Sequence, residues 1–458
     1  MNQPTAQTGA ITSSRPTLRR VLTLKDLIVY GLVLMQVIAP VGIFGFAQSM
    51  SHGHAVTTIL IGMVAMMLTA FSYGRLAAIY QSAGSAYTYV GRELNVYAGF
   101  LVGWALTLDY FMIPLINTVF GSLTLHRLMP EIPYVAWVAL FVGIITFLNL
   151  RGIRAVANTN TLLLGIMTGV VLMFVVLAIR YIAHRQGWTG LFSFSAFYDP
   201  RTFDIRSVSR ATSLAVLTYV GFDSVTTLSE EVQDARRTVP LATVLICLLV
   251  GIYSVVEVYL AQLAWPDYLR FPNLAMAFLD VSQRVGGPML LEAMGGIAIV
   301  ACLGSGLTGQ VGAARLLYGM GRDNVLPRRL FAHLDAQRGN PTFNIWIIAA
   351  LTFASALFIS YERVAELMNF GAFLGYMGVN LAAIRRFHPR RGSGLLVGFP
   401  AGVLAPGLGF VFCFAIWWGL ATPAKIIGGL WFLLGFVYLA VKTRGFRMRP
   451  GTTDFLES

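Results

Sequence analysis

Charge is scarce in this sequence: only 12% of its 458 residues are Asp, Glu, Lys or Arg. A soluble domain carries about 25% charged residues, so this chain lacks the charge to cover a surface that faces water. Hydrophobic residues make up 57%, and the mean hydropathy is +0.71. A soluble enzyme is therefore excluded. One membrane crossing takes about 20 apolar residues. The length and composition therefore predict a single integral membrane unit with about a dozen crossings.

Several functional motifs are missing as well. The three cysteines, Cys247, Cys302 and Cys413, lie in separate apolar runs, which argues against a disulfide framework and against a metal site. The six histidines are scattered. No Gly-x-x-x-x-Gly-Lys-Ser/Thr run occurs, so ATP is not the expected energy source. We expect neither a metal nor a cofactor.

Long apolar runs are what the sequence has instead, and they predict an all-α integral membrane protein with twelve transmembrane helices. Residues 1–20 are polar and are expected to form a cytoplasmic tail rather than a signal peptide. We divide the remainder into a ten-helix core (21–385), helices 11 and 12 (386–445) and a C-terminal cytoplasmic tail (446–458). The predicted helices lie at about 26–50, 55–80, 96–124, 133–150, 159–181, 209–229, 240–264, 288–319, 342–360, 364–385, 396–419 and 423–442.

The net charge of +13 comes from residues between the apolar runs, so it indicates membrane orientation and not nucleic-acid binding. With both termini in the cytoplasm, more than two thirds of the 33 Lys and Arg residues fall on the cytoplasmic side. Short cytoplasmic loops retain positive charge. The sequence thus predicts a multi-pass protein of the inner (plasma) membrane, surrounded by the lipid bilayer.

Two of the predicted helices contain residues that interrupt a helix. The first has the run Ala39-Pro40-Val41-Gly42-Ile43-Phe44-Gly45, and the sixth has Tyr219-Val220-Gly221-Phe222-Asp223-Ser224. Proline removes a backbone donor and glycine tolerates non-helical torsions. Interruptions five helices apart indicate a five-plus-five inverted repeat with its site at the bilayer midplane. The alternative is that Pro40 only kinks helix 1 and Gly221 only allows close packing.

Several further stretches have a recognisable pattern: Ala83–Tyr89, Gly103-Trp104 with Leu108-Asp109-Tyr110, Gly221–Glu231, Arg315–Asn324 and Asn369–Ala372. In these stretches the chain resembles the amino acid–polyamine–organocation superfamily of permeases, and within it the bacterial putrescine importers. The resemblance implies a leucine-transporter-like fold and a small amine or amino acid as substrate.

The sequence departs from these relatives at helix 1. Amino acid permeases of the superfamily commonly have a Gly-Ser-Gly type break whose N–H groups hold a carboxylate, but this chain has Pro40-Val41-Gly42, and Pro40 has no N–H. The putrescine importers tend to have an aspartate where Gly42 stands. The first departure weakens carboxylate capture, and the second removes one carboxylate that could hold a diamine.

Ionisable residues inside a membrane are costly and mark candidate functional sites. Asp223 could be the counter-ion of a substrate ammonium or could cap the second half of helix 6. For Asp109 in helix 3, a substrate or proton role competes with that of a hydrogen-bonded core residue. Glu230 and Glu231, at the inner end of helix 6, are expected to belong to an ion-pair network that latches the inner gate.

The remaining candidates surround the two breaks. Aromatic residues there could attract an amine cation or could simply pack. Ser305 in Gly304-Ser305-Gly306 could line a cation site with helix 1 carbonyls or make a small-residue helix contact, and sodium is a weaker alternative to a proton on Asp109. The predicted substrate-binding residues are Val41, Gly42, Ile43, Phe44, Asp109, Tyr110, Tyr219, Gly221, Phe222 and Asp223.

The resulting hypothesis is a secondary active transporter that imports a small amino compound, putrescine or a related amine, by proton-coupled alternating access. An amino acid permease, working as a symporter or exchanger, is the main alternative. A channel would need a filter or a ring of charges, and a membrane enzyme would need clustered catalytic side chains. The sequence has neither in evident form.

Overall fold

The computed structural model describes residues 22–81, 84–151, 156–322, 326–333, 341–388 and 400–448. These residues form helices joined by loops, and the one β-bridge among them pairs Leu22 with Val232. The proposed tails, 1–20 and most of 446–458, lie outside the described residues. The helices are α1 (Leu24–Met35), α2 (Pro40–Met50), α3 (Ala55–Ile79), α4 (Ser85–Glu93), α5 (Val96–Leu128), α6 (Tyr134–Arg151), α7 (Val156–Gln186), η1 (Trp188–Phe192), η2 (Phe194–Ala196), α8 (Ile205–Ala215), η3 (Val216–Tyr219), η4 (Phe222–Glu231), α9 (Ala235–Ala264), η5 (Leu274–Met276), α10 (Ala277–Arg322), α11 (Arg328–Phe331), α12 (Thr342–Ala356), α13 (Tyr361–Phe387), η7 (Pro400–Leu404), α14 (Ala405–Trp418) and α15 (Thr422–Lys442).

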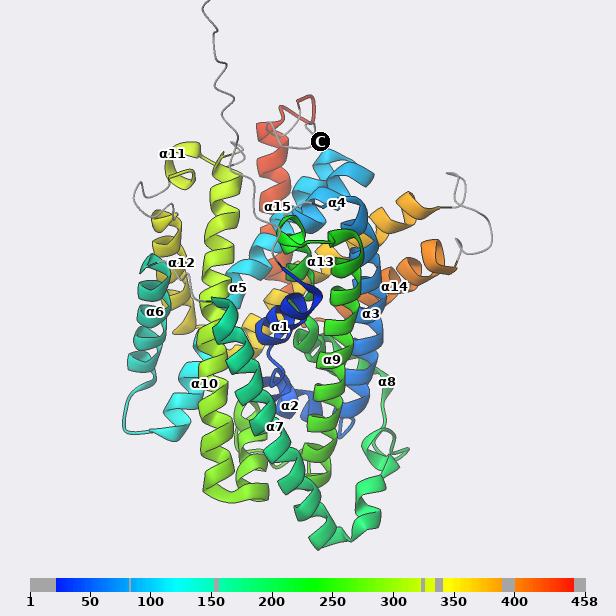
Figure 1. Ribbon diagram of the computed structural model, residues 1–458, viewed down its shortest axis with the longest axis vertical. Coiled ribbons are helices and arrows are strands. Elements are labelled where there is room, and N and C mark those ends of the chain that lie inside the picture. The colour runs from blue at the N-terminus through cyan, green and yellow to red at the C-terminus, as the bar shows by residue number, and fades with distance from the viewer. Residues whose placement is uncertain are drawn as a thin grey trace, which may run out of the picture.

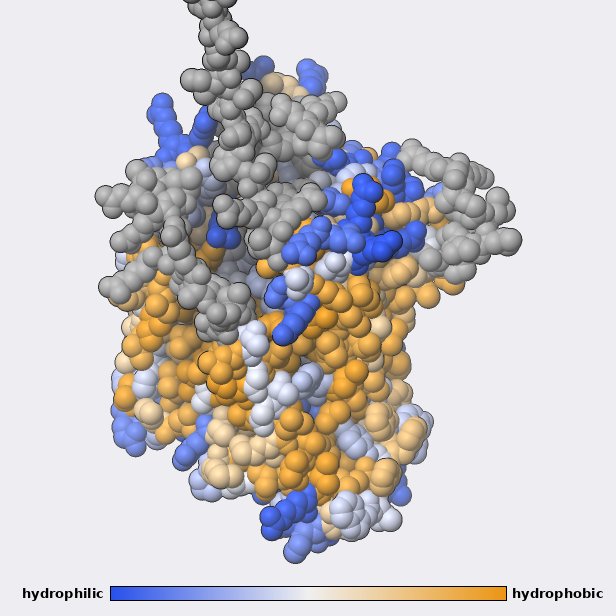
Figure 2. Space-filling model, in the orientation of Figure 1, coloured by the Kyte–Doolittle hydropathy of each residue, from blue (hydrophilic) through white to orange (hydrophobic). Residues whose placement is uncertain are grey.

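The bundle has the surface of a membrane protein. Long helices such as α7, α9 and α10 run along its long axis (Figure 1), and apolar side chains form a band between polar ends (Figure 2). Seven helices of the described chain are long and apolar enough to cross a membrane, and α1 with α2 makes an eighth crossing if the bent pair is one span. The predicted all-α membrane class is therefore confirmed. The other predicted spans match the shorter apolar helices α6, α12 and α14 and the broken run from α8 to η4.

Helix 1 is interrupted as predicted, but the break lies earlier than the sequence suggested. α1 and α2 meet at an angle of 55° across four residues, 36–39, whereas we expected the unwound segment at 39–45. Pro40 does not disrupt the second half: it is the first residue of α2, a position where its missing N–H costs nothing. Gln36 takes the positive φ of 60° that turns the chain.

Helix 6 is interrupted at the predicted place. α8 is followed directly by η3, which ends at Tyr219; Gly221 has a φ of 112°, and the chain continues as the ten-residue 3₁₀ helix η4. Only glycine adopts this φ without strain. A long 3₁₀ stretch inside a membrane helix is unusual and often marks a functional hinge. Helix 8 shows a related feature, since α10 changes direction at Gly287, directly before Pro288.

Close helix packing places α5 at the centre of the bundle, in contact with α10 on one side and α13 on another. At Gly371 in α13 the two backbones nearly touch: a Cβ built there would lie 2.6 Å from the carbonyl oxygen of Ala105 and 3.1 Å from the backbone nitrogen of Asp109. Small residues let membrane helices approach in this way. The position of Asp109 therefore depends on a glycine in a neighbouring helix.

We predict that Gly371→Val destabilises the protein. The added side chain must push α13 away from α5, and overpacking of this kind costs about 1–3 kcal/mol. Gly429→Val in α15 is the matched control because a Cβ at Gly429 meets nothing within 4 Å. In thermal unfolding of the detergent-purified protein, the first variant should melt a few degrees lower and the control should melt like wild type. Equal melting of all three proteins would contradict the close approach.

Candidate functional site

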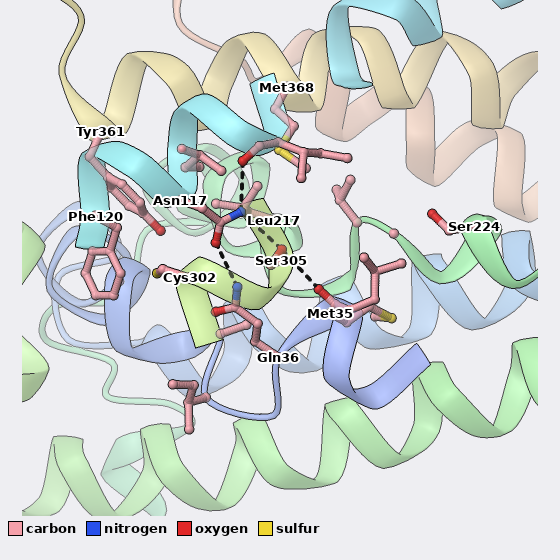
Figure 3. A pocket seen from close by; sticks show the side chains of 18 residues that line it. Met35, Gln36, Asn117, Phe120, Leu217, Ser224, Cys302, Ser305, Tyr361 and Met368 are labelled. Atoms are coloured by element: carbon pink, nitrogen blue, oxygen red, sulfur yellow. Dashed lines mark hydrogen bonds between the residues drawn. The ribbon is translucent and has the colours of Figure 1, made fainter. Parts of the chain in front are cut away.

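A cavity of about 80 Å³ lies where the breaks in helices 1 and 6 meet α5, α10 and α13. Figure 3 shows its side chains, with Gln36, Asn117 and Ser305 at the centre and Phe120 and Tyr361 at one side. The volume suits a small molecule. The residues that line it are Leu34, Met35, Gln36, Ile38, Ala39, Gly42, Ile113, Ile116, Asn117, Phe120, Leu217, Val220, Gly221, Ser224, Cys302, Ser305, Tyr361 and Met368.

A chain of hydrogen bonds crosses this cavity (Figure 3). Gln36 donates through Nε2 to Oδ1 of Asn117 at 2.8 Å. Asn117 donates through Nδ2 to the Ile113 carbonyl at 2.8 Å and to Oγ of Ser305 at 3.1 Å. Ser305 in turn donates to the Leu34 carbonyl at 3.5 Å. Three side chains and two backbone carbonyls from helix 1, α5 and α10 are thereby held together, and we call Gln36, Asn117 and Ser305 the amide network.

The electrostatics of the cavity favour a positive ligand. The last carbonyls of a helix have no partner within it and give its C-terminal end a partial negative charge, and α1 ends at this cavity with Leu34 and Met35 in the wall. The start of α2, which faces the end of α1, offers few backbone N–H donors. Pro40 has no N–H, and the Val41 N–H is bonded to the Ile38 carbonyl at 3.0 Å. None of the side chains in the described wall carries a charge. The cavity offers oxygen acceptors to an ammonium group and little to a carboxylate.

Of the ten predicted substrate-binding residues, Gly42 and Gly221 line this cavity. A Cβ built on Gly42 would overlap the Tyr361 hydroxyl and lie 3.3 Å from the ring of Phe120. The tyrosine hydroxyl thus fills the space into which a larger side chain at position 42 would extend. Ser305, predicted for coupling, also lines the cavity and does approach a helix 1 carbonyl, that of Leu34.

Four predicted residues point elsewhere. Three of them belong to α2, which is helical from Pro40 onward and turns these side chains into the packed bundle, and the fourth ends η3. Val41 and Ile43 are buried in the core, each 1% exposed. Phe44 packs edge-on against Phe278, with ring centroids 5.7 Å apart. Tyr219 donates its hydroxyl to the Ile59 carbonyl at 3.0 Å. The structure gives these four a packing role in this conformation, and they are not in the cavity wall.

The other four predicted residues gather in a second buried group next to the cavity. Tyr376 donates to Oδ1 of Asp223 at 3.3 Å, and its ring lies 5.1 Å from that of Phe222. Asp109 is 3% exposed, its Oδ1 has no hydrogen-bond partner among the described residues, and it lies near enough to Asp223 for that charge to act on it. The Tyr110 hydroxyl lies close to the side chain of Ser224. We call Asp109, Tyr110, Asp223 and Tyr376 the acid–tyrosine cluster.

Ser224 lies between the two groups, since it lines the cavity and is close to Tyr110 of the acid–tyrosine cluster. Glu257 is a third buried carboxyl group: it is 0% exposed, and neither oxygen has a partner among the described residues. The described chain contains no cluster of metal-ligating side chains.

The predicted gate residues are only partly described. Glu230 and Glu231 end η4, but their side chains lie outside the described residues, so the proposed ion-pair network stays a prediction. The backbone beside them does make a contact: Val232 pairs with Leu22 in a parallel β-bridge, and the Gln233 N–H donates to the Leu22 carbonyl at 3.2 Å. The end of helix 6 is therefore tied to the start of helix 1.

Sequence reasoning missed Gln36, Asn117 and Tyr361. The signal for Asn117 was a lone amide within the apolar run of helix 3, and that for Gln36 was a polar residue just before the interrupted segment. Charged residues drew attention first because their burial is costly. Neutral amides are cheaper to bury, yet they build the wall of this cavity.

The comparisons with known proteins agree with this geometry. The family model for amino acid permeases matches residues 27–453, and the chain belongs to that family. The chain is 32% identical over 439 residues to the low-affinity putrescine importer PlaP of Escherichia coli strain K12, covering 95% of this chain and 96% of that protein. It is 26% identical to the branched-chain amino acid permease BcaP of Lactococcus lactis, covering 87% and 89%.

The fold is also that of a solved structure. MhsT in complex with L-phenylalanine matches with a TM-score of 0.58 at 15% identity, covering 93% of this chain and all of the other. At this identity the match shows the fold alone. It confirms the leucine-transporter-like architecture with interrupted helices that the sequence predicted.

We predict that Asn117→Leu lowers the affinity for substrate by about tenfold or more, because losing the three hydrogen bonds of the central amide costs about 1.4 kcal/mol or more. Thr124→Val is the matched control: Thr124 is a buried polar residue of the same helix whose hydroxyl bonds only to the Phe120 carbonyl one turn back. Binding would be measured by radioligand uptake at several concentrations. A normal KM in the Asn117 variant would remove the amide network from the site.

Proposed function

We propose that this protein is a secondary active transporter that imports a small amino compound, putrescine or a related amine, by alternating access. The observation that carries the proposal is the uncharged cavity at the junction of the two broken helices, into which the carbonyl end of α1 points. Sites of inverted-repeat transporters form where half-helices meet in this way. The likeness to a putrescine importer over nearly the whole chain supports the same substrate class.

An amine is preferred over an amino acid for a local reason. An amino acid brings a carboxylate that must meet N–H groups or a cation, and α2, the second half of helix 1, begins with a proline. An amine needs only acceptors, which Leu34, Asn117 and Ser224 provide. An amino acid permease is the second candidate, supported by the likeness to a branched-chain amino acid permease and by Ile113, Ile116 and Phe120 in the wall.

Coupling to a proton is proposed for Asp109. Its carboxyl group is buried next to Asp223, and two neighbouring carboxylates resist carrying full charge together. An ammonium in the cavity would favour the charged form of the cluster, so binding of substrate and release of a proton would be linked. Sodium is the weaker alternative, because Ser305 already accepts a hydrogen bond from Asn117 and has one lone pair fewer for a cation.

The orientation proposed is that of an inner-membrane protein with both termini in the cytoplasm. The bridge between Leu22 and Val232 then closes the cytoplasmic end. At the opposite end, Arg127 and Asp280 form an ion pair at 2.7 Å between α5 and α10. Opening one of these contacts while the other stays closed would give each side access in turn. Neither catalysis nor a cofactor is part of the proposal.

We predict that putrescine raises the melting temperature of the purified protein and that branched-chain amino acids do not. A ligand present at 100 times its Kd stabilises the folded state by about 2.7 kcal/mol, which a thermal-shift assay detects. Diamines of different length, monoamines and amino acids would be compared at equal concentrations. Stabilisation by amino acids alone would favour the permease alternative and reject the amine.

We further predict that Asp109→Asn still exchanges substrate across the membrane but no longer accumulates it. The neutral amide keeps the shape and cannot take up or release a proton. Proteoliposomes with and without an imposed proton gradient separate the two activities. Glu257→Gln is the comparison variant and should accumulate normally. The reverse result would move coupling to Glu257, and accumulation driven by sodium alone would move it to the region of Ser305.

A further inference from the structure

A second, larger cavity lies on the other side of α5. It measures about 370 Å³ and is enclosed by α5, the end of α10 that carries Leu317, α12 and α15. Its wall is almost entirely apolar, with Leu108, Met112 and Leu115 from α5 and the stacked pair Trp104 and Trp431 at one corner. An apolar cavity of roughly 150 Å³ already binds a ligand as large as benzene. This one has room for a longer hydrocarbon.

The cavity opens toward the lipid. Leu351 of α12 lines it and is 52% exposed, and α12 and α15 stand apart in the bundle (Figure 1). Along α5 the lining runs from Trp104 to Leu115, a distance of roughly 16 Å at a rise of ~1.5 Å per residue. One leaflet accounts for about half of a hydrocarbon core of ~30 Å. This second cavity, which we call the slot, therefore has about the length of one leaflet.

Positive charge lies at the end of the slot that we assign to the cytoplasm. Leu326 and Phe331 line the cavity there, and between them Arg328 and Arg329 of α11 are exposed. On the neighbouring side, the ring of Tyr438 stacks on that of Trp104, with the ring centroids 5.9 Å apart. The ammonium nitrogen of Lys442 lies 5.7 Å from the centroid of the same tyrosine ring. Basic residues at the mouth of an apolar cleft between membrane helices suit an anionic lipid headgroup.

We propose that this slot binds an acyl chain of an anionic phospholipid of the cytoplasmic leaflet, with Arg328 and Arg329 holding its phosphate. The proposal rests on the orientation given under the proposed function but not on its substrate. It places lipid against Leu108 and Met112, the residues that flank Asp109 along α5. The acid–tyrosine cluster and the lipid would then occupy two faces of one helix.

The test compares the retention of phosphatidylglycerol and phosphatidylcholine with identical acyl chains by the full-length protein, using native mass spectrometry after detergent washing. Wild type should retain phosphatidylglycerol preferentially. Leu351→Trp fills the slot and should lower retention about tenfold; Ser355→Phe, at another position of the wall, is a second filling variant. Leu433→Trp is the control, since Leu433 is 55% exposed on α15 and does not line the slot. Arg328→Gln with Arg329→Gln should abolish the preference for the anionic headgroup.

Equal retention by wild type and both filling variants would overturn the proposal, as would equal retention of the two lipids by wild type. A lipid-free dimer lost in Leu351→Trp would show instead that a second copy of the chain occupies the slot. The readout needs no transport. A loss of lipid binding is thereby distinguishable from a failure of the proposed amine import, which the thermal-shift assay tests separately.

Discussion

The structure depends on how an unwound backbone is satisfied inside a membrane, where each polar group without a partner costs several kcal/mol. Residues 36–39 leave the helix, local turns bond some of the freed backbone groups, and the Ser305 hydroxyl of α10 donates to the Leu34 carbonyl. Asn117 is central because it both accepts and donates. The same groups that stabilise the break form the wall of the cavity. The atoms that stabilise the break are therefore also the ones that a ligand in the cavity would contact.

Most of the fold could be predicted because the bilayer imposes a simple rule of length and hydropathy. The break at Gly221 was located correctly, since only glycine takes its φ of 112° without strain. The break in helix 1 was placed too late because Pro40 was read as a helix breaker. A proline that follows a turn can equally begin a helix, and the torsion of Gln36, which decides the matter, leaves no sequence signal.

The candidate site was only half predictable. The cost of burying charge singled out Asp109 and Asp223, and they do lie together with Tyr110. The sequence could not tell that Ser224, and not the carboxylates, would face the cavity, because η4 is a 3₁₀ helix and its side chains repeat every three residues. It also could not place Tyr361 against Gly42, a contact between residues more than three hundred positions apart.

The 3₁₀ form of η4 has a mechanical consequence. A 3₁₀ helix rises ~2.0 Å per residue and an α-helix ~1.5 Å, so the ten residues Phe222–Glu231 would contract by about 5 Å on converting from one to the other. The torsion angles of the two forms differ little. Conversion of this half-helix to an α-helix would therefore draw the segment that is bridged to Leu22 toward the membrane centre. The backbone hydrogen bonds could change one at a time during this conversion.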